Sequence, residues 1–364
     1  MADPSSSSIA PAQHAAALAG IAPLAPLAPL APVDAPNALV AAAPRNLVLR
    51  FTGSGKEYFR IWLVNLALTV LTLGIYSAWA KVRRLQYFDR NTALDGAVFD
   101  FDGNPAAILR GRILALVLVG AYQYAFGFSL AVGLAVVAGL ITSLPFLMRG
   151  ALRFRLGNTR YRGVRFHFTG SVKGSYGAYL PPVVAFLSPA ALVAIEPASL
   201  ALLPVLYLLW PLMHGAMKRY QHGNVSYAGL PSRMALPKRS FYRPYFGLLG
   251  VSMLSVIVAV LCGVLIALVA LLALGGFDNI DAGTSGKLSV ALGLMMVYLM
   301  YLMSGPYLQV RIGNMVWSAT SFPGVTITST MRAFEFAKLQ TVNTVLTLLS
   351  LGLYRPFAVV NVYQ

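Results

Sequence analysis

The sequence predicts an all-α integral membrane protein with six transmembrane helices, and three observations favour this fold class. Only 11% of the 364 residues are charged and 58% are hydrophobic, whereas a soluble domain carries about a quarter charged residues. The uncharged runs have the length of one or two membrane-spanning helices. The basic residues, 28 Lys and Arg against 11 Asp and Glu, bracket these runs. This pattern is typical of loops that set membrane topology, so we expect the lipid bilayer as a partner and no nucleic acid.

Residues 1–44 are predicted to be a disordered tail rich in alanine and proline, followed by a polytopic membrane domain over residues 45–364. Within residues 23–32 a proline recurs at every third position, which removes backbone donors and prevents a helix. The first basic residue is Arg45, so the tail lacks the positively charged start of a secretory signal. The tail is either a plain linker or a ligand for an aromatic-lined groove, and a linker is the simpler interpretation.

Three long apolar stretches predict three helical hairpins, which together supply the six transmembrane helices. Each stretch is about twice the roughly 20 residues that one helix needs to cross the hydrocarbon core. The stretches are residues 113–148, residues 177–217, and the pair 244–275 and 288–310. Aromatic, glycine, proline or acidic residues mark the expected turns at residues 122–127, at Glu196 with Pro197, and at residues 277–281.

Basic residues concentrate in the loops at one end of these hairpins. The opposite ends carry only Glu196, Asp278, Asp281 and Lys287. By the positive-inside rule the basic loops are expected in the cytoplasm, and the three hairpins point outward.

Two shorter apolar segments, residues 61–80 and 342–362, lie near the ends of the chain. They share a pattern: Asn65 precedes Gly74 by nine residues, and Asn343 precedes Gly352 by nine. Each segment either crosses the membrane, which would raise the number of spans to eight, or turns back at its glycine as a broken, re-entrant helix. The charges that flank residues 61–80 do not decide between these alternatives.

A second repeat lies in the basic loops. The motif Phe51-Thr52-Gly53-Ser54 recurs at residues 168–171 and, more loosely, at residues 101–104. An asparagine then precedes a glycine in four places: Asn91 and Gly96, Asn158 and Gly163, Asn224 and Gly229, and, with a longer gap, Asn314 and Gly324. Aromatic residues alternate after Asp95-Gly96, which is typical of a β-hairpin. We therefore expect small cytoplasmic β-hairpins between the membrane hairpins.

These motifs resemble those of the YjgN-like family of bacterial inner-membrane proteins, whose function is unknown. The similarity is strongest at Phe51-Thr52-Gly53-Ser54-Gly55-Lys56, Gly74-Ile75-Tyr76-Ser77-Ala78-Trp79, Asn158-Thr159-Arg160-Tyr161-Arg162-Gly163 and Gly352-Leu353-Tyr354-Arg355-Pro356-Phe357. The resemblance covers about residues 46–364 and implies a multi-pass protein of the bacterial inner membrane. The tail lies outside the family pattern. The family usually continues into a basic stretch beyond the position of Gln364, which leaves the completeness of the last unit open.

Neither the sequence nor the resemblance indicates catalysis. We therefore expect that the protein is not an enzyme and that it has no cofactor and no metal site. The hydrolase and phosphate-loop motifs are missing, and Cys262 is the only cysteine. No charged residue lies near the centre of the six predicted spans, which argues against proton-coupled transport. His214 is interpreted as an interfacial residue in preference to a proton relay. Met295, Met296, Met300 and Met303 are interpreted as packing residues and not as ligands of a soft metal.

Two candidate sites remain, and they predict two classes of function. Asn65, Gly74, Asn343 and Gly352 either hold the broken segments together or contact a substrate. Broken helices in repeated units are typical of transporters, which weakly favours small-solute or lipid translocation. The alternative is a non-transporting module that binds anionic lipid or a partner protein through an arginine-rich cytoplasmic face. Its candidate lipid contacts are Arg153, Arg155, Arg160, Arg162 and Arg165. The sequence leaves homo-oligomerisation open.

Overall fold

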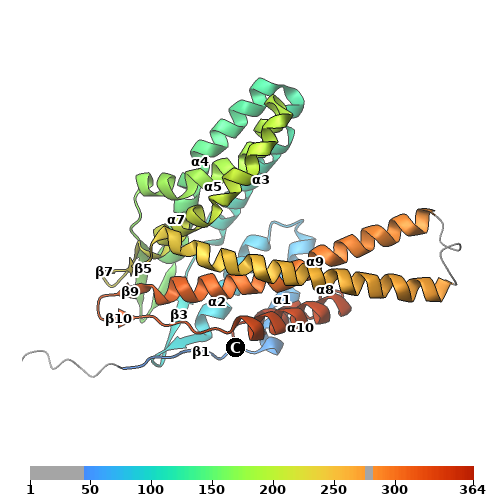
Figure 1. Ribbon diagram of the computed structural model, residues 1–364. Coiled ribbons are helices and arrows are strands. Elements are labelled where there is room, and N and C mark those ends of the chain that lie inside the picture. Colours follow the sequence, from blue (N-terminus) through green and yellow to red (C-terminus); the bar gives the residue numbers. More distant parts are fainter. Residues whose placement is uncertain (1–44, 275–281) are drawn as a thin grey trace, which may run out of the picture. The chain divides into compact units, whose positions relative to one another are not determined.

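Helices make up most of the described chain, as the composition predicts (Figure 1). The computed structural model describes residues 45–274 and 282–364, so the predicted tail and the predicted turn at residues 277–281 lie outside the described residues. The helices are α1 Gly55–Leu71, α2 Ser77–Arg90, α3 Pro105–Phe128, α4 Leu130–Gly157, α5 Val172–Ile195, α6 Leu203–Leu208, α7 Trp210–His222, α8 Tyr242–Leu274, α9 Ala282–Ser318, α10 Ala333–Leu349 and α11 Arg355–Asn361, with short 3-10 helices η1 Pro197–Leu202 and η2 Lys238–Phe241.

Four helices of the described chain are long and apolar enough to cross a membrane. They cover Pro105–Phe128, Leu130–Gly157, Lys238–Val269 and Ser289–Ser318, and they correspond to the first and third predicted hairpins. In the first hairpin the turn lies at Ser129, just beyond the predicted residues 122–127. The Ser129 backbone is extended, and its side chain accepts a hydrogen bond from the Val132 amide and caps α4.

The middle predicted hairpin, residues 177–217, is less regular than the other two. Its first leg is the single helix α5, which continues through Pro181, Pro182 and Pro189. The predicted turn at Glu196 is found, because α5 ends at Ile195. The return leg is divided into η1, α6 and α7 and is not one helix. The total of six to eight spans therefore stays a prediction.

The predicted β-hairpins are present, but they join into sheets. The strands are β1 Leu49–Phe51, β2 Thr92–Leu94, β3 Ala97–Phe101, β4 Thr159–Tyr161, β5 Val164–Phe168, β6 Val225–Tyr227, β7 Leu230–Pro231, β8 Arg233–Met234, β9 Thr320–Phe322 and β10 Val325–Thr326. Strands β1 to β7 form one antiparallel sheet in chain order, and β8 to β10 form a second. Tyrosines link successive hairpins: the Tyr161 hydroxyl donates to the Leu94 carbonyl at 2.7 Å, and the Tyr227 hydroxyl donates to the Tyr161 carbonyl at 2.9 Å.

The turns of three hairpins use two consecutive residues with positive φ. The pairs are Asp95 and Gly96 at 50° and 74°, Arg162 and Gly163 at 48° and 76°, and Ala228 and Gly229 at 50° and 80°. Positive φ at both central residues is the geometry of a type I′ turn, whose twist matches that of the strands it joins. Glycine at the second position removes the steric cost there, which explains why the sequence repeats a glycine at this point.

The repeated asparagine and the repeated phenylalanine motif contact each other and form one recurring joint between a helix end and a strand end. The amides of Asn91, Asn158 and Asn224 donate to the carbonyl four residues earlier at 2.8, 2.6 and 2.8 Å and end their helices. The backbone carbonyls of the same asparagines accept from the amides of Thr52, Asp102 and Thr169 at 2.9, 2.8 and 2.8 Å. Each joint therefore ties the end of one helix to the residue that follows the motif phenylalanine.

Asn314, the fourth copy, has a different role, and this explains its longer distance from Gly324. Helix α9 continues past it to Ser318. The Asn314 side chain instead donates to the Met331 carbonyl at 2.8 Å and accepts from the Met331 amide at 3.1 Å. It holds the segment that leads from β10 to α10.

Both terminal apolar segments turn back at their glycines. In the first, Tyr87 near the end of α2 donates through its hydroxyl to the Ser54 carbonyl at 2.8 Å and accepts from the Ser54 amide at 2.8 Å. Ser54 caps the start of α1, so α1 and α2 form a hairpin whose two outer ends meet. The pairing of β1 with β2 adds a second link between the chain before α1 and the chain after α2. Residues 61–80 are thus two short helices and not one continuous span.

The second terminal hairpin, α10 and α11, repeats the turn of the first almost atom for atom. Leu73 and Gly74 have φ of 48° and 92°, and Leu351 and Gly352 have φ of 50° and 93°. The Gly74 amide donates to the Thr69 carbonyl, and the Gly352 amide donates to the Thr347 carbonyl, both at 2.7 Å. These matching bonds show that the second repeat seen in the sequence is a structural repeat.

The two terminal hairpins pack on each other and bring the two ends of the described unit together. The rings of Phe59 and Phe357 stack with centroids 5.5 Å apart. Tyr363 lies 4.4 Å from Phe88, measured between ring centroids. The Gln364 side chain donates to the Gly53 carbonyl at 3.1 Å. This aromatic cluster is the packed base on which the α1–α2 hairpin stands.

Candidate functional site

The five arginines predicted to contact lipid divide into two groups. Arg160 and Arg165 both pair with Asp102, the latter at 3.5 Å, and Arg162 pairs with Asp95 at 2.7 Å. These pairs join the hairpin of β4 and β5 to the chain around β2 and β3. Asp95 and Asp102 are therefore more than turn residues, because they neutralise arginines of the next unit. Arg160, Arg162 and Arg165 therefore form ion pairs that link neighbouring hairpins of the sheet.

Arg153 and Arg155 are exposed near the end of α4, and neither forms a salt bridge with a described carboxylate, although the charge of Arg155 acts on the Asp89 carboxyl of α2. They lie beside further positive charge. Burial lowers the pKa of the Lys81 ammonium on α2, and the neighbouring charges of Arg84, Arg155 and Arg112 lower it further. Positive potential is therefore concentrated where α2, α3 and α4 approach each other.

The second candidate site separates into two kinds of position. Gly74 and Gly352 lie in the turns of the terminal hairpins, where a Cβ would meet nothing within 4 Å. Asn65 and Asn343 lie deeper, with 7% and 3% of their surfaces exposed. Asn65 lies within α1 and Asn343 within α10, whereas Gly74 and Gly352 lie beyond the ends of these helices, so asparagine and glycine occupy different levels of each hairpin.

Asn343 is tied to α11 by hydrogen bonds. Its amide donates to the Ala358 carbonyl at 3.1 Å, and its side-chain carbonyl accepts from the Asn361 amide at 3.2 Å. The equivalent carbonyl oxygen of Asn65, Oδ1, is buried and has no hydrogen-bond partner. The residue at the position equivalent to Asn361 is Arg83. The first hairpin thus lacks the donor that completes the second.

Arg83 instead lines a groove of about 520 Å³ between α1 and α2. The α1 side supplies Arg60, Ile61 and Val64, and the α2 side supplies Arg83, Gln86, Tyr87, Arg90 and the adjoining Asn91. Arg60 and Arg83 are exposed and pair with no described carboxylate. Arg90 pairs through Nε with Asp100 at 2.8 Å. The groove therefore presents two guanidinium groups that form no salt bridge with a described carboxylate, beside aliphatic side chains, while the Glu57 carboxylate accepts a hydrogen bond from the groove residue Tyr87 at 3.3 Å.

Aromatic packing and a short ion pair hold this groove in shape. The Arg83 guanidinium lies 5.7 Å from the centroid of the Tyr76 ring, a cation–π contact. Burial raises the pKa of the Asp100 carboxyl, but bonds from Arg90 and the Phe101 amide outweigh it, so the net pKa is below the ordinary value. Asp100 is therefore ionised near neutral pH and keeps Arg90 in place.

Arg60, Arg83 and Arg90 were not predicted as site residues, because in the sequence they resemble the other basic residues that set topology. One signal was available. Arg83, Gln86 or Tyr87, and Arg90 follow one another at helical spacings of three, four and seven, which places them on one face of a helix. Arg60 lines the same groove but belongs to a different helix, α1. Only the turn at Gly74 brings Arg60 near the residues of α2.

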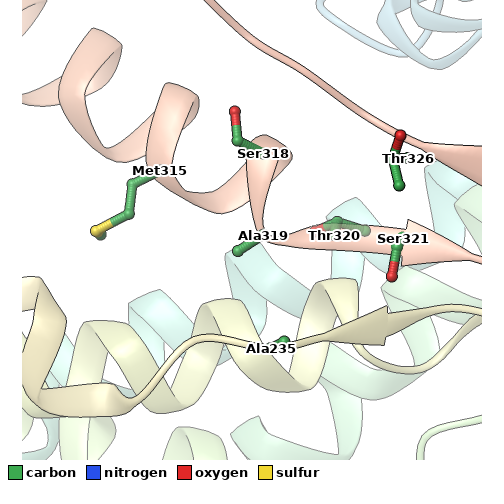
Figure 2. A pocket seen from close by; sticks show the side chains of 7 residues that line it. All are labelled: Ala235, Met315, Ser318, Ala319, Thr320, Ser321 and Thr326. Carbon is green, nitrogen blue, oxygen red and sulfur yellow. The ribbon is translucent and has the colours of Figure 1, made fainter.

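A second hollow, of about 490 Å³, lies where α9 runs into β9 (Figure 2). Its lining is small and uncharged: Ala235, Met315, Ser318, Ala319, Thr320, Ser321 and Thr326. The Ser318 hydroxyl accepts from the Ser329 amide at 3.1 Å, so part of this polar lining already serves the fold. The groove between α1 and α2 is the better candidate for a ligand, because it concentrates charge.

The long apolar helices and the apolar outer surfaces of the terminal hairpins define the class of this protein, a helical membrane protein. No grouping of three or more His, Cys, Asp or Glu that would suit a metal ion occurs among the described residues. The chain belongs to the DUF898 family, described as bacterial protein of unknown function, which matches residues 46–364. The family resemblance seen in the sequence is thereby confirmed.

Curated relatives carry the name inner membrane protein YjgN. The protein of Salmonella typhimurium is 30% identical over 146 residues, which cover 38% of this chain and 36% of the relative. That of Escherichia coli O157:H7 is 32% identical over 144 residues, or 37% and 35% of the two chains. That of Escherichia coli K12 is 31% identical over 144 residues, or 37% and 35%. The aligned part thus spans about a third of each relative. No solved structure matches the chain.

Proposed function

We propose that this protein is a multi-pass module of the bacterial inner membrane that binds anionic phospholipid on the cytoplasmic side. The observation that carries the proposal is the polarity of the α1–α2 hairpin. Its tip is apolar and open, with Leu73 94% exposed. Arg60, near the start of α1, and Arg83, midway along α2, are exposed and form no salt bridge with a described carboxylate. An apolar tip above cationic residues suits a hairpin that enters one leaflet from the side of anionic head groups.

The α10–α11 hairpin supports the same arrangement. Leu351 at its tip is 95% exposed. Its turn repeats that of the first hairpin, and both hairpins stand on one aromatic base. In this proposal the two hairpins are re-entrant, the sheets and basic loops are cytoplasmic, and the arginines near the interface attract anionic lipid at about 1 kcal/mol each.

Lipid preference is the property to test first. The full chain, purified in a neutral detergent and freed of lipid, is titrated with phosphatidylglycerol or with zwitterionic phosphatidylcholine, and its melting temperature is followed. Phosphatidylglycerol should raise the melting temperature more than phosphatidylcholine does, because a ligand that binds the folded state stabilises it. The difference should shrink in high salt, which screens exposed charges. Equal shifts for the two lipids would refute the proposal.

Sidedness is tested separately with single cysteines in a Cys262→Ser background. Phe128→Cys and Pro197→Cys lie at the predicted outer turns and should react with a membrane-impermeant thiol reagent in intact cells. Val48→Cys, just before β1, and Ala228→Cys, in a sheet turn, should react only after permeabilisation. Labelling of Val48→Cys in intact cells would place the chain before α1 outside and would remove the re-entrant arrangement.

Translocation of a small polar solute is the second candidate function, and one observation favours it. The Asn65 Oδ1 atom is buried without a hydrogen-bond partner, and a buried polar atom of this kind is available to a polar ligand. Uptake of a solute by vesicles that contain the protein, lost in Asn65→Ala and kept in Asn343→Ala, would support this alternative. Uptake that depends equally on both asparagines would indicate a structural role.

A further inference from the structure

Resting on the proposed function, we infer that the groove between α1 and α2 is the lipid site, and that it holds the phosphodiester of one anionic phospholipid. The groove offers the guanidinium groups of Arg60 and Arg83, the outer nitrogens of Arg90 and the amide of Gln86. Arginine forks match the geometry of phosphate oxygens and donate two hydrogen bonds at once. A volume of about 520 Å³ is in the range of small-molecule sites.

The apolar part of the same groove indicates that the ligand is a lipid and not a soluble phosphate. Ile61 and Val64 line the groove beside Arg60. Leu68 and Leu71 follow on the same face of α1, at helical spacings of four and seven from Val64. Val64 is 50% exposed and Leu71 is 79% exposed. A phosphate held at the base would therefore direct its acyl chain along an open apolar strip towards the tip at Leu73.

The comparison of the two terminal hairpins supports a site in the first hairpin alone. Arg83 has Asn361 as its counterpart, and that side chain bonds to Asn343 and to the Tyr354 hydroxyl at 3.2 Å each. The second hairpin therefore uses this position internally. The first hairpin keeps a long cation there, although this leaves the Asn65 Oδ1 without a donor. An unpaired buried carbonyl lowers the stability of the first hairpin. A binding site that uses the Arg83 guanidinium would explain why the chain tolerates this loss.

The substitution Arg83→Asn follows from this comparison, because it converts the first hairpin to the pattern of the second. It should weaken binding of phosphatidylglycerol roughly fivefold. The same change should leave the melting temperature of the lipid-free protein unchanged or higher, because the new amide can donate to the Asn65 Oδ1. Arg60→Gln should weaken binding by a similar factor. Lys238→Gln combined with Arg239→Gln, two exposed charges on η2, is the matched control and should bind as the wild type does.

Binding is measured by native mass spectrometry of the full chain released from detergent, with phosphatidylglycerol titrated at constant phosphatidylcholine. Loss of phosphatidylglycerol adducts in Arg83→Asn and Arg60→Gln, but not in the η2 control, supports the groove. If the wild type prefers phosphatidylglycerol and both groove variants keep this preference, the groove assignment is wrong while the proposed function stands. If the wild type shows no preference, both are wrong. Competition by glycerol 3-phosphate as strong as that of the lipid would show that the occupant is a soluble phosphate.

Discussion

The two buried asparagines of the terminal hairpins provide a matched pair for a stability measurement. Asn343→Ala removes one hydrogen bond to the Ala358 carbonyl and one from the Asn361 amide. A buried hydrogen bond contributes about 1 kcal/mol net, and leaving its partner unsatisfied adds to the loss. We therefore expect the free energy of unfolding to fall by about 2 kcal/mol or more. Asn65→Ala removes an oxygen that has no partner, so its cost should be smaller by at least about 1 kcal/mol.

Thermal unfolding in detergent, followed through the fluorescence of the four tryptophans, measures this difference. For a chain of this size 1 kcal/mol corresponds to about 2 °C, so Asn343→Ala should melt about 4 °C below the wild type and Asn65→Ala within about 2 °C of it. Asn361→Ala is the control for the network. Because Asn343 and Asn361 share a bond, their losses should not add in the double variant. Equal shifts for Asn343→Ala and Asn65→Ala would refute the reasoning.

Two further predictions concern stability and pH. A Cβ on Gly170 would lie 2.6 Å from the Phe168 ring and 2.8 Å from the Tyr220 ring, so Gly170→Ala should lower the free energy of unfolding by about 1–3 kcal/mol, whereas Gly177→Ala, which meets nothing on α5, should raise it slightly; chemical denaturation of both variants checks the opposite signs. Burial, helped by the charge of Lys218, lowers the pKa of His222 to about 4. The folded state therefore prefers neutral His222, so stability is complete above pH 6.5 and declines as the pH falls towards 4. His222→Gln should flatten this part of a plot of melting temperature against pH, and an unchanged plot would contradict the assignment.

Features that depend on a few adjacent residues were accessible from the sequence. The turn at Asp95 and Gly96 requires positive φ at both positions. An Asp-Gly pair is typical of such a turn, so these two residues were enough to predict it. The reversal near Gly74 was open as one of two alternatives for the same reason, since glycine tolerates a φ of 92°. The preceding residue, Leu73, has a φ of 48°. This positive φ could not be predicted from the neighbouring residues.

Features that depend on partners distant in the chain were not accessible. Hairpins read one at a time predict separate units, but the register of Phe101 with Thr159 and of Phe168 with Val225 joins them into one sheet. The local sequence does not identify Asp102 as an ion-pair partner, because Arg160 and Arg165 belong to another unit. The groove between α1 and α2 was missed for a similar reason, since Arg60 and Arg83 line it together only after the chain reverses. Local sequence patterns thus predict the individual helices and hairpins. Contacts between residues distant in the chain determine the sheet and the candidate site.

The order of strands in the large sheet has a consequence for how the protein is made. Each strand from β2 to β7 pairs with the strand before it in the chain, so the sheet can grow one strand at a time as the ribosome delivers each unit. The contact between Gln364 and Gly53 is different, because it spans 311 positions and cannot form until residue 364 has been synthesised. The aromatic side chains of α1 and α2 therefore lack their contacts with Phe357 and Tyr363 until those residues have been synthesised. The sheet can therefore form before the two terminal hairpins pack on each other.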